Sequence, residues 1–512
     1  MALYRRENAR RRQGAVYCRL LHASRQCSLA TKEPAMKSVL FVGVAGVAFL
    51  CSSAPLATRT APGQSVPNPT VTGPIAAAAA PGDPSHQYPF FSTTVDLASH
   101  GYVEEEYFFE GTASRFNIPA SLTASSTPQT AATVVQTGVP YRTRMIVRRP
   151  ISALNFNGTV VMEWQNVAFG FDVDGLWGGS GEHLMRRGYA WIGVSAQRVG
   201  VNGGMGLKAW SPARYGTLDL TAGNAIQDDS LGYDIFSQAA QSVRNPLDTS
   251  PMGTLQVERI IGVGISLGAT YLVAYQNAVH PLAGVFDGFM PLVGGWKVNP
   301  DSEAKAFKVF TETEVAKDVF RQQNSDRFRR WEVAGAAHLP YTFIQAARPL
   351  MLRDLNYPLP ENCTSPPFSR IPWQFVLNAA LDAMVRWVKE GIEPAIAPDM
   401  EVAATDLGGW FPTEIARDAW GNALGGIRLA EHAVPTATNT GLNGPVTSPC
   451  RTYGSYQPFD QETLDSLYPN HGTYVSRVTQ VTQGNVQAGF VVGEDAMVTI
   501  ETAAQSTVGK RQ

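Results

Sequence analysis

Residues 257–280 read VERIIGVGISLGATYLVAYQNAVH, and this stretch decides the fold. Its first part, Val257–Val263, is rich in β-branched residues, as is typical of a buried strand. Ala269–Val279 has the length and composition of a helix, which Pro281 is predicted to end. Between them lies a G-x-S-x-G pattern centred on Ser266. Its turn is too tight for side chains at the glycine positions and exposes the serine at the top of the sheet. Ser266 is therefore predicted to be a nucleophile.

The same stretch allows two other interpretations. Gly262-x-Gly264 after a strand also begins a dinucleotide-binding fingerprint, and Asp287 follows at roughly the right distance. That fingerprint needs a third glycine where this chain has Leu267. The second alternative is a purely structural strand–turn–helix, because a short motif alone does not establish chemistry.

The composition is that of a large folded protein with little net charge. The chain has 512 residues, of which 44% are hydrophobic and 16% charged, which is enough for a large core or two domains. Its 41 basic and 43 acidic residues give a net charge of -2. This balance favours neither a nucleic-acid partner nor a disordered chain. Low charge with 47 Gly and 34 Pro favours a loop-rich extracellular enzyme.

The N-terminus has the features of a targeting sequence. Met36-Lys-Ser leads into the apolar run 39–50, and small residues follow, as in a secretory signal. The run is too short for a stable membrane span. We therefore interpret 1–60 as a targeting segment whose signal peptide starts at Met36, and expect a secreted or periplasmic protein. Whether residues 1–35 are a second targeting segment stays open. The Pro- and Ala-rich residues 61–95 are predicted to be a flexible lead-in.

Outside the targeting segment the chain has two cysteines, Cys363 and Cys450. In a secreted protein such a pair favours a disulfide, here one that would tie a loop to the C-terminal region. Two buried free thiols are the alternative.

Strand-like and helix-like patterns alternate between residues 96 and 400. Strand patterns occur at Thr143–Arg149, Thr159–Trp164, Tyr189–Ser195, Leu282–Met290, Ala306–Thr311 and Arg327–Val333, and helix patterns at Ser180–Arg187, Ile235–Val243 and after Pro372. The alternation predicts an α/β core with a mostly parallel sheet and helices on both faces. The glycine-rich residues 198–232, with Trp210 and Tyr215, are interpreted as a lid-like insertion. Residues 401–512 are predicted to be a loop-rich C-terminal extension packed on the core.

A serine hydroxyl needs a histidine to take its proton and a carboxylate to orient that histidine. His280 would end the same helix as Ser266, roughly 21 Å away, and is out of reach. His338 follows the last predicted strand on a loop of small residues, where active-site groups of α/β sheets collect. His432 and His471 have no such position. His338 is therefore the predicted general base.

The carboxylate is expected after the strand that precedes His338. Two candidates stand there, Glu312 and Glu314. Only one of them is expected to face the histidine. Glu314 is preferred because it lies further out on the loop, and Glu312 stays open as its rival. Asp287 and Asp318 are weaker candidates.

Acyl transfer also needs backbone N–H groups that stabilise the oxyanion of the transition state. One donor should be the amide of Leu267, after the nucleophile. The other should come from the loop that follows Thr159–Trp164, at Val167 or Ala168. No Cys/His cluster has metal-ligand spacing, so neither a metal nor another cofactor is expected.

Several short motifs are similar to those of a known family. They are GYVEEEYF (101–108), EWQNV (163–167), RRGYAWIGVSAQ (186–197), YDIFSQ (233–238), TETEV (311–315), WEVAGAAH (331–338) and GGIR (425–428). Through them residues 95–470 resemble mostly bacterial, often secreted proteins described as α/β-hydrolase domain proteins. The resemblance implies an α/β-hydrolase fold with an integral C-terminal part and an inferred esterase activity. The family usually has Glu-x-Asp where this chain has Glu312-Thr-Glu314, and many members have Gly-Glu-Ser where it has Gly264-Ile-Ser266.

These observations predict a secreted serine hydrolase that cleaves carboxylic esters through an acyl-enzyme. Its triad would be Ser266, His338 and Glu314 or Glu312. The expected substrate is a small-molecule or polymeric ester with an apolar part. An amidase, an acyltransferase or a polyester depolymerase on the same triad is an alternative, as is a non-catalytic binding protein on a hydrolase scaffold. The sequence does not indicate an oligomeric state.

Overall fold

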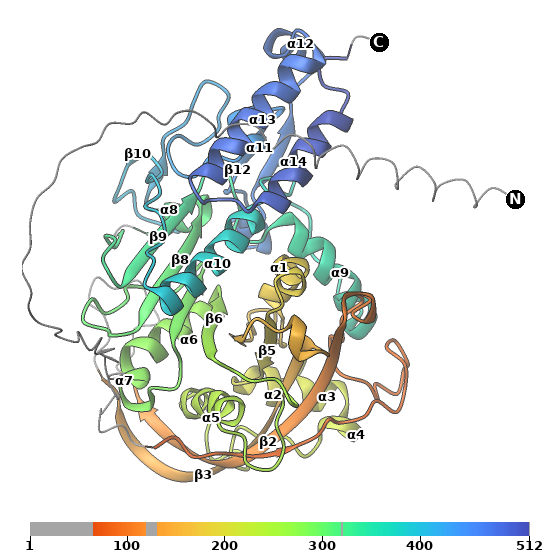
Figure 1. Ribbon diagram of the computed structural model, residues 1–512, viewed down its shortest axis with the longest axis vertical. Coiled ribbons are helices and arrows are strands. Elements are labelled where there is room, and N and C mark those ends of the chain that lie inside the picture. Colours follow the sequence, from red (N-terminus) through yellow and green to blue (C-terminus); the bar gives the residue numbers. More distant parts are fainter. Residues whose placement is uncertain (1–64, 119–130, 319–320, 511–512) are drawn as a thin grey trace, which may run out of the picture. The chain divides into compact units, whose positions relative to one another are not determined.

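The computed structural model describes residues 65–118, 131–318 and 321–510, so the predicted targeting segment lies outside it. One large sheet has the strand order β1-β2-β3-β5-β4-β6-β7-β8-β9 (Figure 1). Its strands are β1 (Thr70–Thr72), β2 (Tyr102–Asn117), β3 (Thr133–Pro150), β4 (Thr159–Trp164), β5 (Ala190–Val194), β6 (Arg259–Ile265), β7 (Gly288–Leu292), β8 (Lys305–Thr311) and β9 (Phe328–Val333). The pairs from β5 to β9 are parallel, and those linking β1, β2, β3 and β5 are antiparallel. The predicted α/β fold with a mostly parallel sheet is confirmed.

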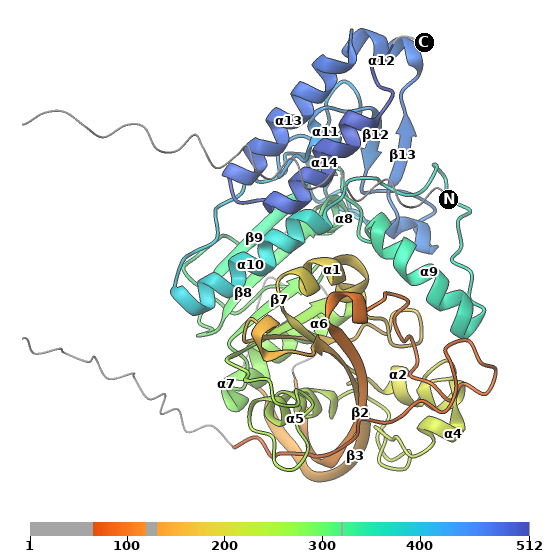
Figure 2. The same cartoon turned by 45° about the vertical axis from the view of Figure 1, so that its right-hand side comes forward.

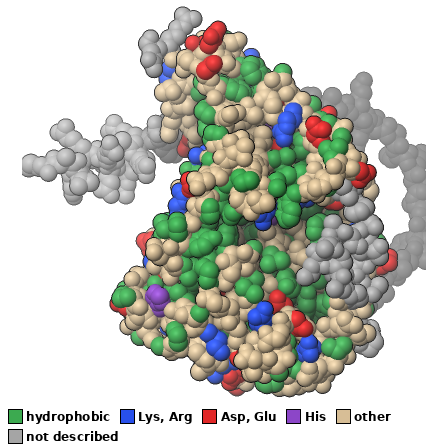
Figure 3. Space-filling model, turned by 180° about the vertical axis from the view of Figure 1, so that it is seen from behind, with side chains coloured by type: hydrophobic (Ala, Val, Ile, Leu, Met, Phe, Trp, Pro, Cys, Tyr) green, Lys and Arg blue, Asp and Glu red, His purple; other side chains and the backbone are tan. Residues whose placement is uncertain are grey.

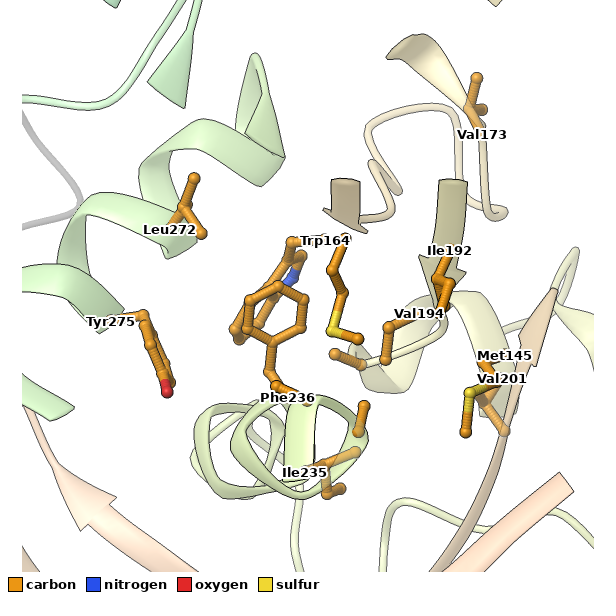
Figure 4. Packing of buried hydrophobic residues seen from close by; sticks show 14 of the residues in the cluster. Met145, Trp164, Val173, Ile192, Val194, Val201, Ile235, Phe236, Leu272 and Tyr275 are labelled. Atoms are coloured by element: carbon orange, nitrogen blue, oxygen red, sulfur yellow. The ribbon is translucent and has the colours of Figure 1, made fainter. Parts of the chain in front are cut away.

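Helices cover both faces of this sheet (Figures 1 and 2). The main ones are α1 (Gly175–Arg186), α5 (Gly232–Arg244), α6 (Leu267–Ala274) and α10 (Gln374–Glu390). Successive residues of a strand point to opposite faces. In β4, Trp164 packs in one core cluster with residues of α5 and α6, whereas Val161 belongs to the cluster that includes residues of α1 and α10. Figure 4 shows Trp164 beside Phe236 of α5, with ring centroids 5.0 Å apart.

The long β2–β3 hairpin extends beyond the one strand expected here. Polar residues interrupt its apolar pattern because the hairpin buries ion pairs. Arg144 lies 2.9 Å from Glu106, and Arg148 lies 2.8 Å from Glu104. A buried guanidinium must be paired, and the neighbouring strand supplies its carboxylate.

Residues 65–95 differ from the flexible lead-in that was expected. Strand β1 pairs with β2, and Tyr88, Phe90 and Phe91 are buried in the main core cluster. The Pro- and Ala-rich composition misled the prediction because these three aromatic side chains supply enough apolar surface to fix the segment.

The helix after Ser266 also runs further than predicted. It continues from α6 through a π-helical turn (Tyr275–Val279) into α7 (His280–Ala283). Pro281 lies in the first turn of α7, the part of a helix that tolerates proline best. Gly284, with a positive φ of 61°, follows the last helical residue.

The segment 198–232 is folded into the core. It forms α2 (Arg198–Asn202), α3 (Leu207–Trp210) and α4 (Pro212–Tyr215). Trp210 and Tyr215 are both buried, and the Tyr215 hydroxyl donates to Glu106 at 2.6 Å. The aromatic residues that suggested a lid are therefore core residues.

The C-terminal part contacts the core at several points. The Ile427 N–H donates to the Glu332 carbonyl of β9 at 2.7 Å, and the Thr313 hydroxyl donates to the Gly441 carbonyl at 2.6 Å. Cys363 and Cys450 form a disulfide, as predicted. The elements here are β10 (Val402–Ala404), β11 (Glu414–Ile415), α11 (Ala430–Ala433), β12 (Ala437–Thr440), β13 (Ser455–Pro458), α12 (Gln461–Leu467), α13 (His471–Gln487) and α14 (Gly493–Gln505).

This C-terminal part is less loop-rich than expected, because α13 and α14 run side by side (Figure 1). The sequence of α13 gives only a weak helix signal, because it is rich in Thr and Val and buries only Val478 and Thr482.

On the face that Figure 3 shows, acidic and basic side chains are interspersed. Among the described residues, no helix combines the length and the apolarity needed to span a membrane.

Candidate active site

Ser266 occupies a strained turn between β6 and α6. Its φ of 57° and ψ of -115° lie outside the regions that non-glycine residues favour. A Cβ at Gly264 would lie 2.5 Å from the Gly268 carbonyl oxygen, and one at Gly268 would lie 2.6 Å from the Trp164 carbonyl oxygen. Both glycines are therefore required by the backbone, as the sequence pattern predicted. The Ser266 side chain is partly exposed.

His338 lies beside this serine. Its Nε2 is 2.7 Å from the Ser266 Oγ. The histidine follows β9 on the short loop that the sequence indicated, and its backbone N–H donates to the Thr313 hydroxyl at 3.1 Å. Thr313 in turn donates to the Gly441 carbonyl, so the C-terminal part helps to hold the histidine loop. The ring is almost fully buried, with 7% of the residue exposed.

Glu314, rather than Glu312, faces the histidine. The Glu314 Oε1 lies 2.6 Å from His338 Nδ1. Strand β8 ends at Thr311, and α8 (Glu312–Lys317) begins at once, so the two carboxylates lie about 200° apart around a helix. Glu312 is buried on another side and pairs with Arg417 of the C-terminal part.

Thr311 fixes the other oxygen of Glu314. The hydroxyl and the backbone N–H of Thr311 both donate to Glu314 Oε2. The bond from the Thr311 N–H, together with the bond that the Thr311 side chain accepts from the Glu314 backbone N–H, makes a capping box at the start of α8. The T-x-x-E spacing of this capping box was present in the sequence and would have indicated both the helix and the orientation of Glu314.

The Glu314 carboxylate is held in its ionised form. Burial alone would raise the pKa of Glu314, but the charge of His338, its hydrogen bond, the nearby Lys317 and the Thr311 hydroxyl together lower it below the ordinary value. A carboxylate that stays ionised can stabilise an imidazolium beside it.

The two segments predicted to supply the oxyanion-hole amides are both connected to the Ser266 turn. Leu267 is the first residue of α6. The Ala168 N–H donates to the Asn166 side-chain oxygen at 2.7 Å, while the Asn166 amide nitrogen donates to the Ile265 carbonyl at 2.7 Å. Asn166, which the sequence did not single out, therefore links this loop to the serine turn. The Val167 N–H donates to no other described residue.

Ser266 and His338 line a cavity of about 280 Å³. Its wall is mostly apolar and includes Ile265, Phe169, Phe343, Tyr357, Trp373, Leu339 and Leu377. Pro449, Arg451 and Thr452, next to the disulfide-bonded Cys450, line another side. Residues 198–232 contribute nothing to this wall, so the interpretation of that segment as a lid is wrong. The cavity is instead walled by residues near α9 (Tyr341–Leu355) and α10 and by the C-terminal part.

The remaining histidines lie elsewhere. His432 is buried and accepts from Arg428 Nε at 3.2 Å, and His471 lies 2.8 Å from the Val508 carbonyl. No group of three His, Cys, Asp or Glu residues within the described ranges could hold a metal ion.

A family model described as alpha/beta hydrolase domain matches residues 71–501. The chain belongs to this alpha/beta hydrolase domain family. The match includes most of the C-terminal part, in agreement with its contacts to β9 and α8. No curated protein matches the chain.

The solved structures that match the chain are similar to it only in part. An arylesterase is 14% identical, with a TM-score of 0.26, over 42% of this chain and 80% of its own. An alpha-beta serine hydrolase homologue from Coxiella burnetii is 13% identical, with a TM-score of 0.26, over 42% of this chain and 92% of its own. A putative acetyl xylan esterase from Bacteroides fragilis is 12% identical, with a TM-score of 0.22, over 37% of this chain and only 44% of its own. The family assignment therefore rests on the family model.

Proposed function

We propose that the protein is a secreted or periplasmic serine hydrolase that cleaves carboxylic esters through an acyl-enzyme. The observation that carries this proposal is the unbroken contact from Ser266 Oγ to His338 Nε2, at 2.7 Å, and from His338 Nδ1 to Glu314 Oε1, at 2.6 Å. This is the arrangement that turns a hydroxyl into a nucleophile. The disulfide is compatible with an oxidising compartment.

In the first half of the reaction, His338 takes the Ser266 proton as Oγ attacks the ester carbonyl carbon. The carbonyl oxygen becomes an oxyanion, which the N–H groups of Leu267 and Val167 stabilise. Val167 is chosen over Ala168 because the Ala168 N–H already donates to Asn166. His338 then donates its proton to the departing alcohol, which leaves the acyl group on Ser266.

In the second half, His338 removes a proton from water, and the resulting hydroxide attacks the acyl carbon. The carboxylic acid leaves and Ser266 regains its proton. Throughout, Glu314 orients the ring and stabilises the imidazolium through Nδ1.

The apolar wall around Ser266 suits an ester with an apolar part. Phe169, Phe343 and Tyr357 supply apolar surface there, which was expected from the segment 198–232.

Labelling with a fluorophosphonate probe tests this proposal. The wild type should be labelled, and Ser266→Ala should not. Ser476→Ala is a matched control, because Ser476 is exposed on α13; it should label like the wild type. A folded wild type that resists labelling would instead support a binding protein.

Turnover of p-nitrophenyl esters, compared with turnover of anilides and of polyester film, separates an esterase from an amidase or a depolymerase. Transfer of the acyl group to added alcohols would reveal an acyltransferase.

A further inference from the structure

The turn that carries Ser266 packs against the loop of residues 293–296, called here the β7 loop because it follows β7. The Ser266 N–H donates to the carbonyl of Leu292, the last residue of β7, at 3.0 Å. A Cβ at Gly294 would lie 2.6 Å from the Ser266 carbonyl oxygen and 3.1 Å from the Ser266 Cα. With contacts this close, a shift of the β7 loop is transmitted directly to the backbone of the nucleophile.

The β7 loop is itself strained. Val293 has a φ of 40°, a conformation that β-branched residues avoid, and its side chain is buried. Ser266, with a φ of 57°, is strained as well, so two unfavourable backbone conformations occur in segments that pack on each other. Strain of this kind persists only where surrounding contacts hold the chain in place, and it gathers at functional sites. Another group must therefore hold the β7 loop.

Lys308 of β8 makes the contacts that hold this loop. Its Nζ donates to the Gly295 carbonyl at 2.7 Å and also to the Trp296 carbonyl. The residue is only 3% exposed, and its Nζ lies 5.3 Å from the centre of the Phe310 ring. Both acceptors are backbone carbonyls, whereas a buried charge is usually paired with an opposite charge. The ammonium group thus joins β8 to two successive peptide groups of the β7 loop.

Placing an ammonium group here has a cost in free energy. Burial lowers the pKa of Lys308 to about 7, while Asp318 favours the charged form and Arg330 disfavours it. An apolar side chain of similar length, such as methionine, would pack in β8 without this cost. What the lysine adds beyond apolar packing is the pair of hydrogen bonds to the β7 loop.

We propose that Lys308 is a positioning residue of the active site, which holds the β7 loop and thereby keeps Ser266 in the strained conformation that presents its Oγ to His338. This inference rests on the proposed esterase function and adds a residue to its machinery. Neither Lys308 nor the β7 loop lines the cavity at Ser266. The effect of Lys308 should therefore fall on the reactivity of Ser266 and not on the binding of substrate.

Lys308→Met tests the proposal, because it keeps the approximate length of the side chain and removes its N–H groups. With a p-nitrophenyl ester, kcat should fall by about 10- to 100-fold, as a small misplacement of a reacting group does, while KM stays within about twofold. The rate constant of fluorophosphonate labelling should fall by a similar factor, since labelling depends on the nucleophile. Thermal melts establish that the variant is folded at the assay temperature.

Lys305→Met is the matched control. Lys305 stands on the same strand, and its Nζ also donates to a backbone carbonyl, but to that of Trp387 in α10. This variant should keep the kcat and the labelling rate of the wild type. A folded Lys308→Met with unchanged kcat and labelling rate, or an equal loss in Lys305→Met, would overturn the inference.

Val293→Gly separates positioning from a general loss of stability. Glycine adopts a positive φ without strain, so a loop with glycine at this position should depend less on Lys308. The loss of kcat caused by Lys308→Met should therefore be several-fold smaller in the Val293→Gly background than in the wild-type background. Equal losses in the two backgrounds would show that Lys308 does not act through the strained loop, and would overturn the inference.

Lys308→Gln covers the case in which Lys308→Met does not fold. Its polar side chain ends one bond short of the position of Nζ and cannot reach both carbonyls, so kcat and the labelling rate should again fall. A folded Lys308→Gln with wild-type values of both would overturn the inference. A wild type that is labelled at Ser266 would in that case leave the proposed esterase function standing, whereas a folded wild type that resists labelling would refute both.

Discussion

Glu314 holds His338 through a contact of 2.6 Å between its Oε1 and the imidazole Nδ1. Glu312, two positions earlier, pairs with Arg417 instead. We therefore expect Glu314→Gln to lower kcat by about 10³- to 10⁴-fold, as loss of the orienting carboxylate does in related triads. Glu312→Gln is the control and should keep kcat within a few-fold of the wild type. Steady-state kinetics on a p-nitrophenyl ester distinguish the two. A larger loss of kcat in Glu312→Gln than in Glu314→Gln would show that Glu312, and not Glu314, is the triad acid.

Thr311 should matter for both stability and catalysis, because its hydroxyl and N–H fix the second oxygen of Glu314. Thr311→Val keeps the shape but removes the hydroxyl. We expect the free energy of unfolding to fall by about 1 kcal/mol, as for a lost helix cap, and kcat to fall because the carboxylate is less well oriented. Thr311→Ser should restore both. Failure of serine to restore kcat would mean that the hydroxyl does not act through Glu314.

The disulfide should stabilise the wall of the cavity at Ser266. Cys363 and Cys450 are 87 positions apart, and Cys450 stands between two residues of that wall, Pro449 and Arg451. Removing a native disulfide typically costs about 2–4 kcal/mol, so Cys450→Ser should unfold at lower urea concentration. Reductant should shift the wild type to the same midpoint and leave the variant unchanged. A wild-type unfolding midpoint in urea that does not change when reductant is added would contradict this role.

Glu163 should make stability depend on pH. Burial, followed by the nearby Asp174 carboxylate, raises the pKa of Glu163 to about 8. An unfolded glutamate ionises near its ordinary pKa of 4.5. Between these values the folded state keeps a proton that the unfolded state has lost, so this contribution to stability is full below 4.5 and disappears as pH rises through 8.

Glu163→Gln removes this titration and isolates its effect. The melting temperature of the wild type relative to the variant should fall between pH 5 and pH 8. Calorimetry at several pH values measures this difference. A constant difference across the range would show that Glu163 titrates outside it.

Local patterns predicted the centre of the fold well. Strand β4 was expected at its observed bounds, because a buried parallel strand is a continuous apolar run. The order of Ser266 and His338 after strands of one parallel sheet was enough to bring them to the same edge. Glu314 was preferred because it lies further out after β8, although the chain there is a helix and not a loop.

The other expectations failed because the outcome depended on contacts between residues far apart in the sequence. Trp210 and Tyr215 suggested a lid, but their burial depends on partners such as Glu106 of β2, more than 100 positions away. Helix α13 has a weak periodic pattern because it packs mainly on α14 and buries little.

The most direct test of the account is to trap the acyl-enzyme. Acid-quenched enzyme and p-nitrophenyl octanoate, digested and analysed by mass spectrometry, should yield the Ser266 peptide with one octanoyl group attached. A burst of about one p-nitrophenol per active site should accompany it. An octanoyl group on another residue, or full turnover by Ser266→Ala, would contradict the account.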